Sequence, residues 1–391
     1  MMYCARGGRA SRGVFDGYIS YDRPVKERLI SLDAFRGITI ASMILVNNPG
    51  SWGHIYSQLD HAEWNGWTFT DLIFPFFLFI TGVSIVFAFS RRAGRPRREL
   101  YLKIARRALI LFALGLFLNG FPSYDLSTIR IMGVLQRISV CYLVASISFL
   151  ELGTSALGAL SIGLCLIYWA LMSWYPTPDI GPGMWEKGHN FAAYVDQMVL
   201  GKHVWAAGKT WDPEGVVSTL PAIANTIFGI FAGLWLNSSR SQDEKLKGML
   251  AAGAAGLFAG WLWSLVLPIN KNLWTPSYAV FMSGFALVVL SVFYWAIEIR
   301  GRKAWAHPFV VYGSNAITVF VFSGLVARLL NLWKVALPSG KTTAVKNWIY
   351  LNFFASWLSP LNASLAFALA FIAFTYAAMW ALYKKGIFLK A

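Results

Sequence analysis

One short segment places several reactive side chains directly before a long apolar run. The stretch DHAEWNGWTFTD, residues 60–71, contains His61, Asn65 and Asp71, and the residues that follow it to Gly82 are almost all apolar. Histidine can take up and release protons near neutral pH. A carboxylate that accepts a hydrogen bond from one imidazole nitrogen fixes the tautomer and increases the basicity of the other nitrogen. The segment therefore predicts a general base, His61, that Asp71 orients.

A single loop histidine is more often only hydrated, so the neighbouring side chains matter. Asn65 lies four residues after His61, and Asn47 ends the preceding apolar run in MILVNNPG. An amide at such a place either caps a helix end or donates a hydrogen bond to a substrate carbonyl on which negative charge develops. We therefore predict a catalytic group of His61, Asp71, Asn47 and Asn65.

Two arginines lie inside another apolar run, STIRIMGVLQRISVCYLV. Arg130 and Arg137 are seven residues apart, which is two turns on one helix face, and Gln136 is adjacent. Guanidinium groups bind phosphates through paired hydrogen bonds, which would suit the pyrophosphate of a cofactor. Ion pairs with Asp71, Glu151 or Asp125 explain the arginines as well, and both interpretations stay open.

Further polar groups flank other apolar runs. Asp212 and Glu214 precede a predicted helix in TWDPEGVVSTLPAI, where acids interact favourably with the helix dipole or bind an amine. Lys271, in LPINKNLWTPSY, lies in a polar turn whose side chains are candidates for ligand contact. The chain has no HExxH motif and no cysteine pair with metal-ligand spacing, so no metal site is predicted.

The composition is that of a membrane protein. Of the 391 residues, 57% are hydrophobic and 13% are charged, whereas a soluble domain has about 25% charged residues. The net charge of +16 would suggest nucleic acid in a soluble protein. Here the basic residues lie between apolar runs, where they orient a membrane protein, so no nucleic-acid partner is expected.

Ten apolar runs are long enough to cross a bilayer, and they predict an all-α polytopic membrane protein. The runs are 32–48, 67–89, 101–120, 130–150, 155–175, 216–237, 248–267, 275–298, 307–330 and 362–383. The shorter apolar stretch 348–358 is interpreted as an interfacial or re-entrant helix. Residues 1–28 are expected to form a flexible cytoplasmic tail, and residues 29–391 one transmembrane domain.

The distribution of basic residues predicts the orientation. With both termini inside, the cytoplasmic segments hold 23 lysines and arginines and the outer loops hold 7. Cytoplasmic loops carry the excess of basic residues, so both termini are expected in the cytoplasm and the loops 49–66 and 176–215 outside. The strongest basic cluster, RRAGRPRRELYLKIARR, is also suited to anionic lipid or to a phosphorylated cofactor.

Five motifs, in order along the chain, resemble the heparan-α-glucosaminide N-acetyltransferase family. They are SLDAFRGITIASMILVNNPGSW, HAEWNGWTFTDLIFPFFLFITGVSI, IRIMGVLQR, WDPEGVVSTLPAI and PINKNLWTPSYAVF. The resemblance extends from about residue 29 to the C-terminus. Lysosomal members carry an additional N-terminal luminal domain, and this chain is expected to be a bacterial homologue without it.

The resemblance implies a transmembrane acetyltransferase that takes acetyl from cytosolic acetyl-CoA. It implies that the acetyl group reaches the amine of a glucosamine unit on the far side of the membrane. The HAxWNG motif places the active histidine at His61. Asn47 and Asp71 match a further asparagine and acid of the same site. Arg130, Gln136 and Arg137 match the polar residues of the family's RIxGVLQR motif.

Residues and resemblance together predict an acetyl-CoA-dependent N-acetyltransferase of the bacterial inner membrane. Its expected partners are acetyl-CoA, an amino-sugar acceptor and membrane lipid, and the family suggests a homodimer. His61 would deprotonate the amine or carry the acetyl group, while Arg130, Gln136 and Arg137 would bind CoA. Two alternatives stay open: a transporter of an amino sugar or anionic solute, and an O-acyltransferase acting on an envelope glycan.

Overall fold

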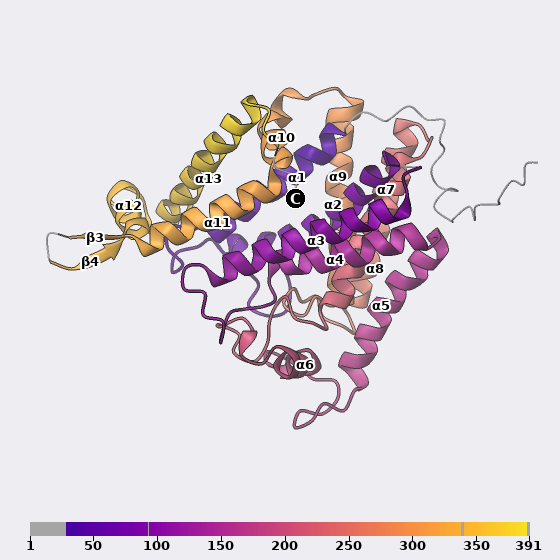
Figure 1. The fold of residues 1–391 in the computed structure, drawn as a ribbon, viewed down its shortest axis with the longest axis horizontal. Coiled ribbons are helices and arrows are strands. Elements are labelled where there is room, and N and C mark those ends of the chain that lie inside the picture. The colour runs from indigo at the N-terminus through magenta and orange to yellow at the C-terminus, as the bar shows by residue number, and fades with distance from the viewer. Residues whose placement is uncertain (1–28, 93, 338–339, 389–391) are drawn as a thin grey trace, which may run out of the picture.

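The computed structural model describes residues 29–92, 94–337 and 340–388 (Figure 1). The tail predicted for residues 1–28 lies outside these ranges. Thirteen α-helices make up the described chain: α1 Ile30–Asn47, α2 Phe69–Ser90, α3 Arg97–Gly120, α4 Val134–Glu151, α5 Thr154–Trp174, α6 Phe191–Leu200, α7 Thr219–Asn237, α8 Gln242–Trp263, α9 Pro276–Tyr294, α10 His307–Ser314, α11 Ala316–Leu332, α12 Val345–Phe353 and α13 Pro360–Lys384.

The only strands among the described residues form two short antiparallel hairpins. One pairs β1, Trp185–Glu186, with β2, His189–Asn190, and the other pairs β3, Lys334–Ala336, with β4, Thr342–Ala344. The β3–β4 hairpin and α12 project to one side of the helix bundle beyond the end of α11 (Figure 1). The architecture is therefore an α-helical bundle with small peripheral hairpins.

The spans confirm the predicted all-α polytopic membrane fold. Eight of the described helices are individually long and apolar enough to cross a membrane, and the α10–α11 pair makes a ninth. The remaining predicted span, 101–120, lies within α3, a helix of 24 residues whose first half is strongly basic. The short predicted helix at 348–358 corresponds to α12, although its placement at the membrane surface stays a prediction.

Two details of the predicted spans are wrong. The run 307–330 is not one straight span, because the chain bends by 73° between α10 and α11. Asn315 at the bend has non-helical backbone angles, and its side-chain amide donates to the Ile387 carbonyl oxygen at 3.1 Å. The run 130–150 also begins too early, since α4 starts at Val134 and Arg130 lies in the segment before it.

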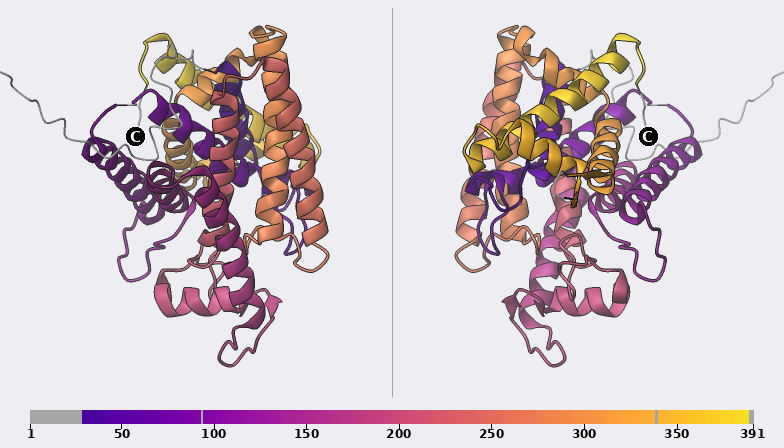
Figure 2. Two further views of the ribbon diagram at one scale, coloured as in Figure 1. Left: turned by 90° about the vertical axis from the view of Figure 1, so that its right-hand side faces the viewer. Right: turned by 90° about the vertical axis from the view of Figure 1, so that its left-hand side faces the viewer.

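Connecting segments gather at two ends of the bundle because successive spans run in opposite directions. At one end, called the His61 end, the α1–α2 loop is joined to the α8–α9 turn by a hydrogen bond from Gly66 N to Ile269 O at 2.8 Å. Trp64 Nε1 donates to Trp185 O at 2.9 Å in the same region. Figure 2 shows α6 and its neighbouring loops projecting beyond the helices at this end.

The opposite end, called the Arg91 end, contains the beginnings of α1, α3 and α8 and the ends of α2, α4 and α9. Ser31 N donates to Glu298 Oε1 at 2.9 Å, which joins the start of α1 to the end of α9. Arg97 pairs with Glu151 at 2.7 Å between α3 and α4. The prediction that this end faces the cytoplasm rests on its basic residues.

Glycines allow the central helices α2 and α7 to approach closely. A Cβ atom on Gly229 would lie 2.0 Å from the Phe79 carbonyl oxygen, and one on Gly82 would lie 1.9 Å from the Thr226 carbonyl oxygen. Small residues at such crossings let helix backbones pack directly in membrane proteins, where van der Waals contact drives association. The α2–α7 contact therefore fixes the position of α2, the helix that follows the His61 loop.

Substitution of Gly229 by alanine should destabilise the protein. The added methyl group overlaps the α2 backbone, and overpacking of this kind costs about 1–3 kcal/mol. Thermal unfolding in detergent, followed by the reactivity of the buried Cys141 and Cys165 thiols, measures the effect. The matched control is Gly163→Ala in α5, where a Cβ meets no atom within 4 Å. Equal unfolding temperatures for the two variants would contradict the close α2–α7 contact.

Candidate active site

His61 and Asp71 form a hydrogen-bonded pair, as the sequence predicted. His61 Nδ1 lies 2.6 Å from Asp71 Oδ1. The Asp71 side chain is 1% exposed, whereas the His61 side chain is 47% exposed. An ionised carboxylate only accepts hydrogen bonds, so His61 carries its proton on Nδ1 and presents the lone pair of Nε2. This is the arrangement that a general base requires.

Asp71 is fixed by the backbone around it. Its second oxygen, Oδ2, accepts hydrogen bonds from Ala62 N and Thr68 N, each at 3.0 Å. Thr68 and Asp71 form a capping box at the start of α2, in which each side chain satisfies the backbone of the other residue. The spacing Thr68-x-x-Asp71 is the sequence signature of this capping box, and it marks the start of α2.

Pro75 adds a further constraint on Asp71. A proline has no backbone N–H, so the carbonyl four residues earlier loses its helical partner. That carbonyl belongs to Asp71, and it accepts a hydrogen bond from the Tyr278 hydroxyl at 2.6 Å instead. Tyr278 is fully buried in α9. The position of Asp71 therefore depends on α9 as well as on its own helix.

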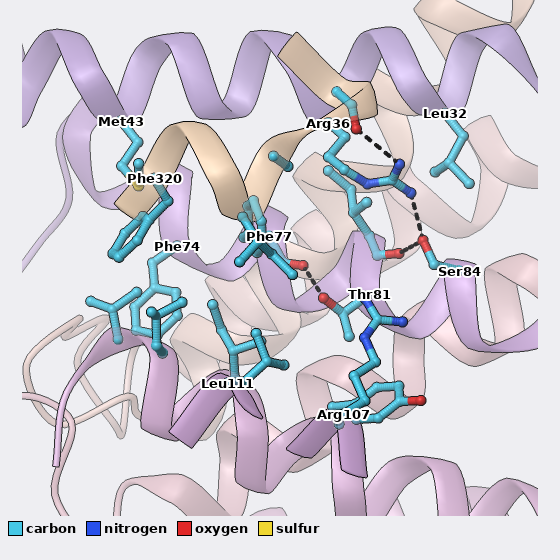
Figure 3. A pocket seen from close by; sticks show the side chains of 18 of the residues that line it. Leu32, Arg36, Met43, Phe74, Phe77, Thr81, Ser84, Arg107, Leu111 and Phe320 are labelled. Atoms are coloured by element: carbon cyan, nitrogen blue, oxygen red, sulfur yellow. Dashed lines mark hydrogen bonds between the residues drawn. The ribbon is translucent and has the colours of Figure 1, made fainter. Parts of the chain in front are cut away.

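His61 lines a cavity of about 760 Å³ that extends between the two ends of the bundle. At the His61 end its walls include Asn47, Thr70, Glu214 and Lys271. Apolar side chains line the middle: Phe74 and Phe77 from α2, Leu111 from α3 and Phe320 from α11 (Figure 3). The cavity is thus polar near His61 and apolar through the centre of the bundle.

Cations line the cavity at the Arg91 end. We call the five residues Arg91, Arg92, Lys103, Arg106 and Arg107 the basic mouth. Arg107 lies over the Tyr142 ring at 4.7 Å, and Lys103 pairs with Glu99 at 2.7 Å. Arg91 and Arg106 have no carboxylate partner among the described residues. The basic segment that the sequence marked as suitable for lipid or a phosphorylated cofactor therefore faces the cavity.

Arg36 lies between the basic mouth and the apolar middle. It pairs with Asp33 at 2.9 Å. It also donates to Ser84 Oγ at 2.7 Å (Figure 3). These contacts join α1 to α2 on the wall of the cavity. Asp33 and Arg36 are three residues apart in α1, so their ion pair lies on one face of this helix.

The two predicted asparagines occupy different positions. Asn47 is exposed at the C-terminal end of α1, and its side chain lines the cavity together with His61. Asn65 is absent from the cavity lining, and its Oδ1 accepts a hydrogen bond from Asn270 Nδ2 at 3.1 Å. Asn47 is therefore placed to contact a substrate, whereas Asn65 joins the His61 loop to the α8–α9 turn.

Arg130 pairs with acids that the sequence analysis had not assigned to it. Its guanidinium binds both oxygens of Asp212, at 2.8 and 2.5 Å, and Glu214 at 2.5 Å. Burial alone lowers the pKa of Arg130, but the two carboxylates outweigh this effect and raise its pKa. Asp71, Glu151 and Asp125 were the wrong partners, because the fold brings the distant 212–214 turn to Arg130.

Arg137 and Gln136 are buried and also lie outside the cavity lining. Arg137 donates to the Gly215 carbonyl at 3.1 Å and to the Ser218 hydroxyl, and it lies 5.0 Å from the Trp274 ring centroid. Gln136 is 1% exposed. Since Arg130 precedes α4, the three residues do not form one helical stripe. Their predicted binding of CoA stays a prediction without a supporting contact.

The turn at 212–216 is organised by Asp196 of α6. Asp196 accepts hydrogen bonds from Val216 N at 2.9 Å and Asp212 N at 3.1 Å. Burial raises the pKa of Asp196 to about 6. A Cβ on Gly215 would lie 2.2 Å from the Asp196 carboxylate, so a larger residue there would displace this side chain. The loop 176–215, which contains Asp196, thus positions Glu214 on the cavity wall.

No group of three or more histidine, cysteine or acidic side chains in the described ranges could hold a metal ion. The His61–Asp71 pair can carry acid–base or nucleophilic chemistry. The pair with Asp71, the nearby Asn47 amide and the adjoining cavity together suit transfer of an acyl group to a nucleophile.

Comparison with known proteins gives a consistent result. The family model described as heparan-alpha-glucosaminide N-acetyltransferase, catalytic, matches residues 28–259. The mouse protein named heparan-alpha-glucosaminide N-acetyltransferase is 30% identical, and the match covers 80% of this chain and 56% of that protein. The human protein of the same name is also 30% identical, and the match covers 75% of this chain and 52% of that protein. The chain therefore spans about half the length of these relatives.

Replacement of Arg130 by methionine should destabilise the His61 end. It leaves the buried Asp212 and Glu214 without their cation, a change that costs about 3–5 kcal/mol. The loss of stability in this variant should be largest near neutral pH. Burial raises the pKa of Glu214, but Arg130 and the other cations outweigh this and lower it. The wild type therefore loses stability as the pH falls, whereas the variant regains stability once its carboxylates are protonated.

Thermal unfolding from pH 7 to pH 4 measures this difference. Arg95→Met is the matched control, because Arg95 forms only an exposed pair with Glu99 and its removal should change nothing measurable. A constant difference between Arg130→Met and the wild type across this pH range would contradict the role of the buried carboxylates.

Proposed function

The chain belongs to the heparan-α-glucosaminide N-acetyltransferase family. On that premise we propose that it takes acetyl from acetyl-CoA at the Arg91 end and delivers it to the amine of a glucosamine-type sugar at the His61 end. The observation that carries this proposal is a single cavity whose lining includes both the basic mouth and His61, the imidazole that pairs with Asp71.

The shape and chemistry of the cavity fit the two halves of CoA. The nucleotide half carries phosphates, and the five cations of the basic mouth supply paired and single charges that bind them. The pantetheine arm is long and narrow, and Phe77, Leu111 and Phe320 surround the section that the arm would occupy. The thioester at its tip would then reach the polar section beside His61.

His61 would act as the general base. The acceptor amine attacks the thioester carbonyl, the C–N bond forms, and Nε2 of His61 takes the proton from nitrogen. The C–S bond then breaks, and His61 returns the proton to the CoA sulfur. Asp71 stabilises the imidazolium that exists between these steps, as it already holds Nδ1–H at 2.6 Å.

Asn47 would stabilise the negative charge that develops on the thioester oxygen. Its amide lines the cavity with His61 and has no hydrogen-bond partner among the described residues. A donor that is already in place at the reacting oxygen costs no reorganisation during the reaction. Asn65 contributes indirectly, because its contact with Asn270 supports the loop that carries His61.

The free Nε2 could instead carry the acetyl group as an acetyl-imidazole. Incubation with labelled acetyl-CoA but no acceptor distinguishes the two routes, since only the carrier route leaves label on His61. A transporter, the second candidate function, is favoured by the same cavity because its lining reaches both ends of the bundle. A transporter would move amino sugar into liposomes without releasing CoA.

Replacement of His61 by alanine should abolish amine-dependent release of CoA. Loss of general-base assistance costs about 10²–10⁴-fold in rate. Asp71→Asn should lower kcat by a similar factor while acetyl-CoA still binds, because the amide cannot hold the Nδ1–H tautomer in the same way. Free thiol release by purified protein with acetyl-CoA and glucosamine measures both effects.

His54→Ala is the matched control, since His54 lies in the same loop but does not line the large cavity. Full activity in His61→Ala would remove this residue from the mechanism. Absence of CoA release by correctly folded wild-type protein, with several amino-sugar acceptors, would favour the transporter.

Substitution of Arg91 and Arg106 by methionine should weaken binding of acetyl-CoA. Each cation lines the basic mouth, and loss of a charged hydrogen bond to a phosphate costs about tenfold in affinity. The KM for acetyl-CoA should rise by this factor for each variant while the KM for glucosamine stays constant. Arg98→Met in α3 is the control, because Arg98 is exposed and outside the lining. An unchanged KM would place the phosphates elsewhere.

A further inference from the structure

Glu214 and Lys271 lie on the wall of the cavity at the His61 end, although they come from separate segments. Glu214 belongs to the turn before α7, and Lys271 belongs to the α8–α9 turn. The proton-transfer scheme above uses neither residue. Their charges are opposite, and both side chains face the space that His61 and Asn47 also line. A polar ligand beside His61 would meet both of them.

The position of Lys271 is fixed through its neighbours. Asn270 Nδ2 donates to Asn65 Oδ1 at 3.1 Å, and Gly66 N donates to Ile269 O at 2.8 Å. The α8–α9 turn is therefore attached to the loop that carries His61. The Lys271 ammonium forms no ion pair or hydrogen bond with any described residue, so its donors are available to a ligand.

Glu214 is positioned by hydrogen bonds to Arg130 and Asp212 and keeps one carboxylate oxygen available. Its Oε2 accepts a hydrogen bond from Arg130 at 2.5 Å, and its backbone N donates to Asp212 Oδ1 at 2.9 Å. The side chain is 3% exposed, yet it contributes to the cavity wall. Within the described chain, no hydrogen bond uses Oε1. The charges of Arg130, Lys271 and Arg137 outweigh burial and lower the pKa of Glu214, which keeps it ionised.

An ionised acceptor and an ammonium donor on one cavity wall match a particular ligand chemistry. An amine next to hydroxyl groups offers N–H and O–H donors to a carboxylate and oxygen acceptors to an ammonium group. A purely anionic ligand would be repelled by Glu214, and a purely cationic one by Lys271. No described contact joins the two side chains as an ion pair, so the space between them is open to such a group.

We propose that Glu214 and Lys271 form the subsite for the acceptor, an amine with neighbouring hydroxyl groups. Glu214 accepts a hydrogen bond from the acceptor's amine or adjacent hydroxyl, and Lys271 donates to a ring-borne oxygen. The amine is thereby directed toward Nε2 of His61. This inference rests on the proposed acetyl transfer and identifies the residues that select its acceptor.

The test compares Lys271→Met with the wild type in acetyl transfer. The methionine keeps the length of the side chain and removes its donors. The KM for glucosamine should rise about tenfold, as expected for one charged hydrogen bond, while the KM for acetyl-CoA stays within twofold. Cyclohexylamine, which lacks hydroxyl groups, should react equally well with both proteins. Lys202→Met is the matched control, since Lys202 is exposed at the same end but outside the lining.

A second variant, Glu214→Gln, removes the charge and leaves an amide oxygen for Arg130. It should raise the KM for glucosamine and for cyclohexylamine alike. An unchanged KM for glucosamine in both folded variants would overturn the subsite. A selective rise in the KM for acetyl-CoA would also overturn it, because the residues would then belong to the CoA site.

The failure of the proposed function can be told apart from failure of the subsite. If wild-type protein releases no CoA, acetyl transfer is wrong, and glucosamine binding is then measured by the shift in unfolding temperature. A shift in the wild type that Lys271→Met loses would support the subsite in a protein of another function. Equal shifts, or no shift in the wild type, would overturn it.

Discussion

A buried, ionised carboxylate is the constraint on which the His61 end of this protein depends. Asp71 is almost completely removed from water at the start of a membrane helix, where an unpaired charge is expensive. Four groups offset that cost: the His61 ring, two backbone N–H groups and the Thr68 hydroxyl. The same hydrogen bonds orient the imidazole, so the stability of the helix start and the orientation of His61 have one physical origin.

A second charged group organises the loops around that pair. Arg130 connects the segment before α4 to the 212–214 turn, and Asp196 holds the other side of the same turn. Arg137 donates to the Gly215 carbonyl of this turn and lies against Trp274. The Trp274 ring in turn packs on Tyr278. Since Tyr278 also binds the Asp71 carbonyl, a continuous set of contacts joins the acidic turn to the His61–Asp71 pair.

Much of this arrangement could be predicted from the sequence, because it depends on local signals. The length of the apolar runs identified the spans. The short separation of His61 and Asp71 along the sequence identified their pair. The partners of Arg130 could not be predicted, since they lie more than 80 residues away and only the packing of α4 against α7 brings them together. The bend at Asn315 was also missed, because the run around it stays apolar and its stabilising contact comes from the C-terminal segment.

A cavity whose lining reaches both ends of a membrane protein would let ions leak across the bilayer unless part of the cavity excludes them. Its middle section, formed by Phe74, Phe77, Leu111 and Phe320, offers an ion no replacement for its hydration shell. An ion that enters this section loses its water at a large energetic cost, whereas a thin, weakly polar chain loses little. The aromatic section would thus let a flexible arm pass while keeping the membrane potential intact. The proposed acetyl transfer would then draw its energy from the thioester alone and consume no ion gradient.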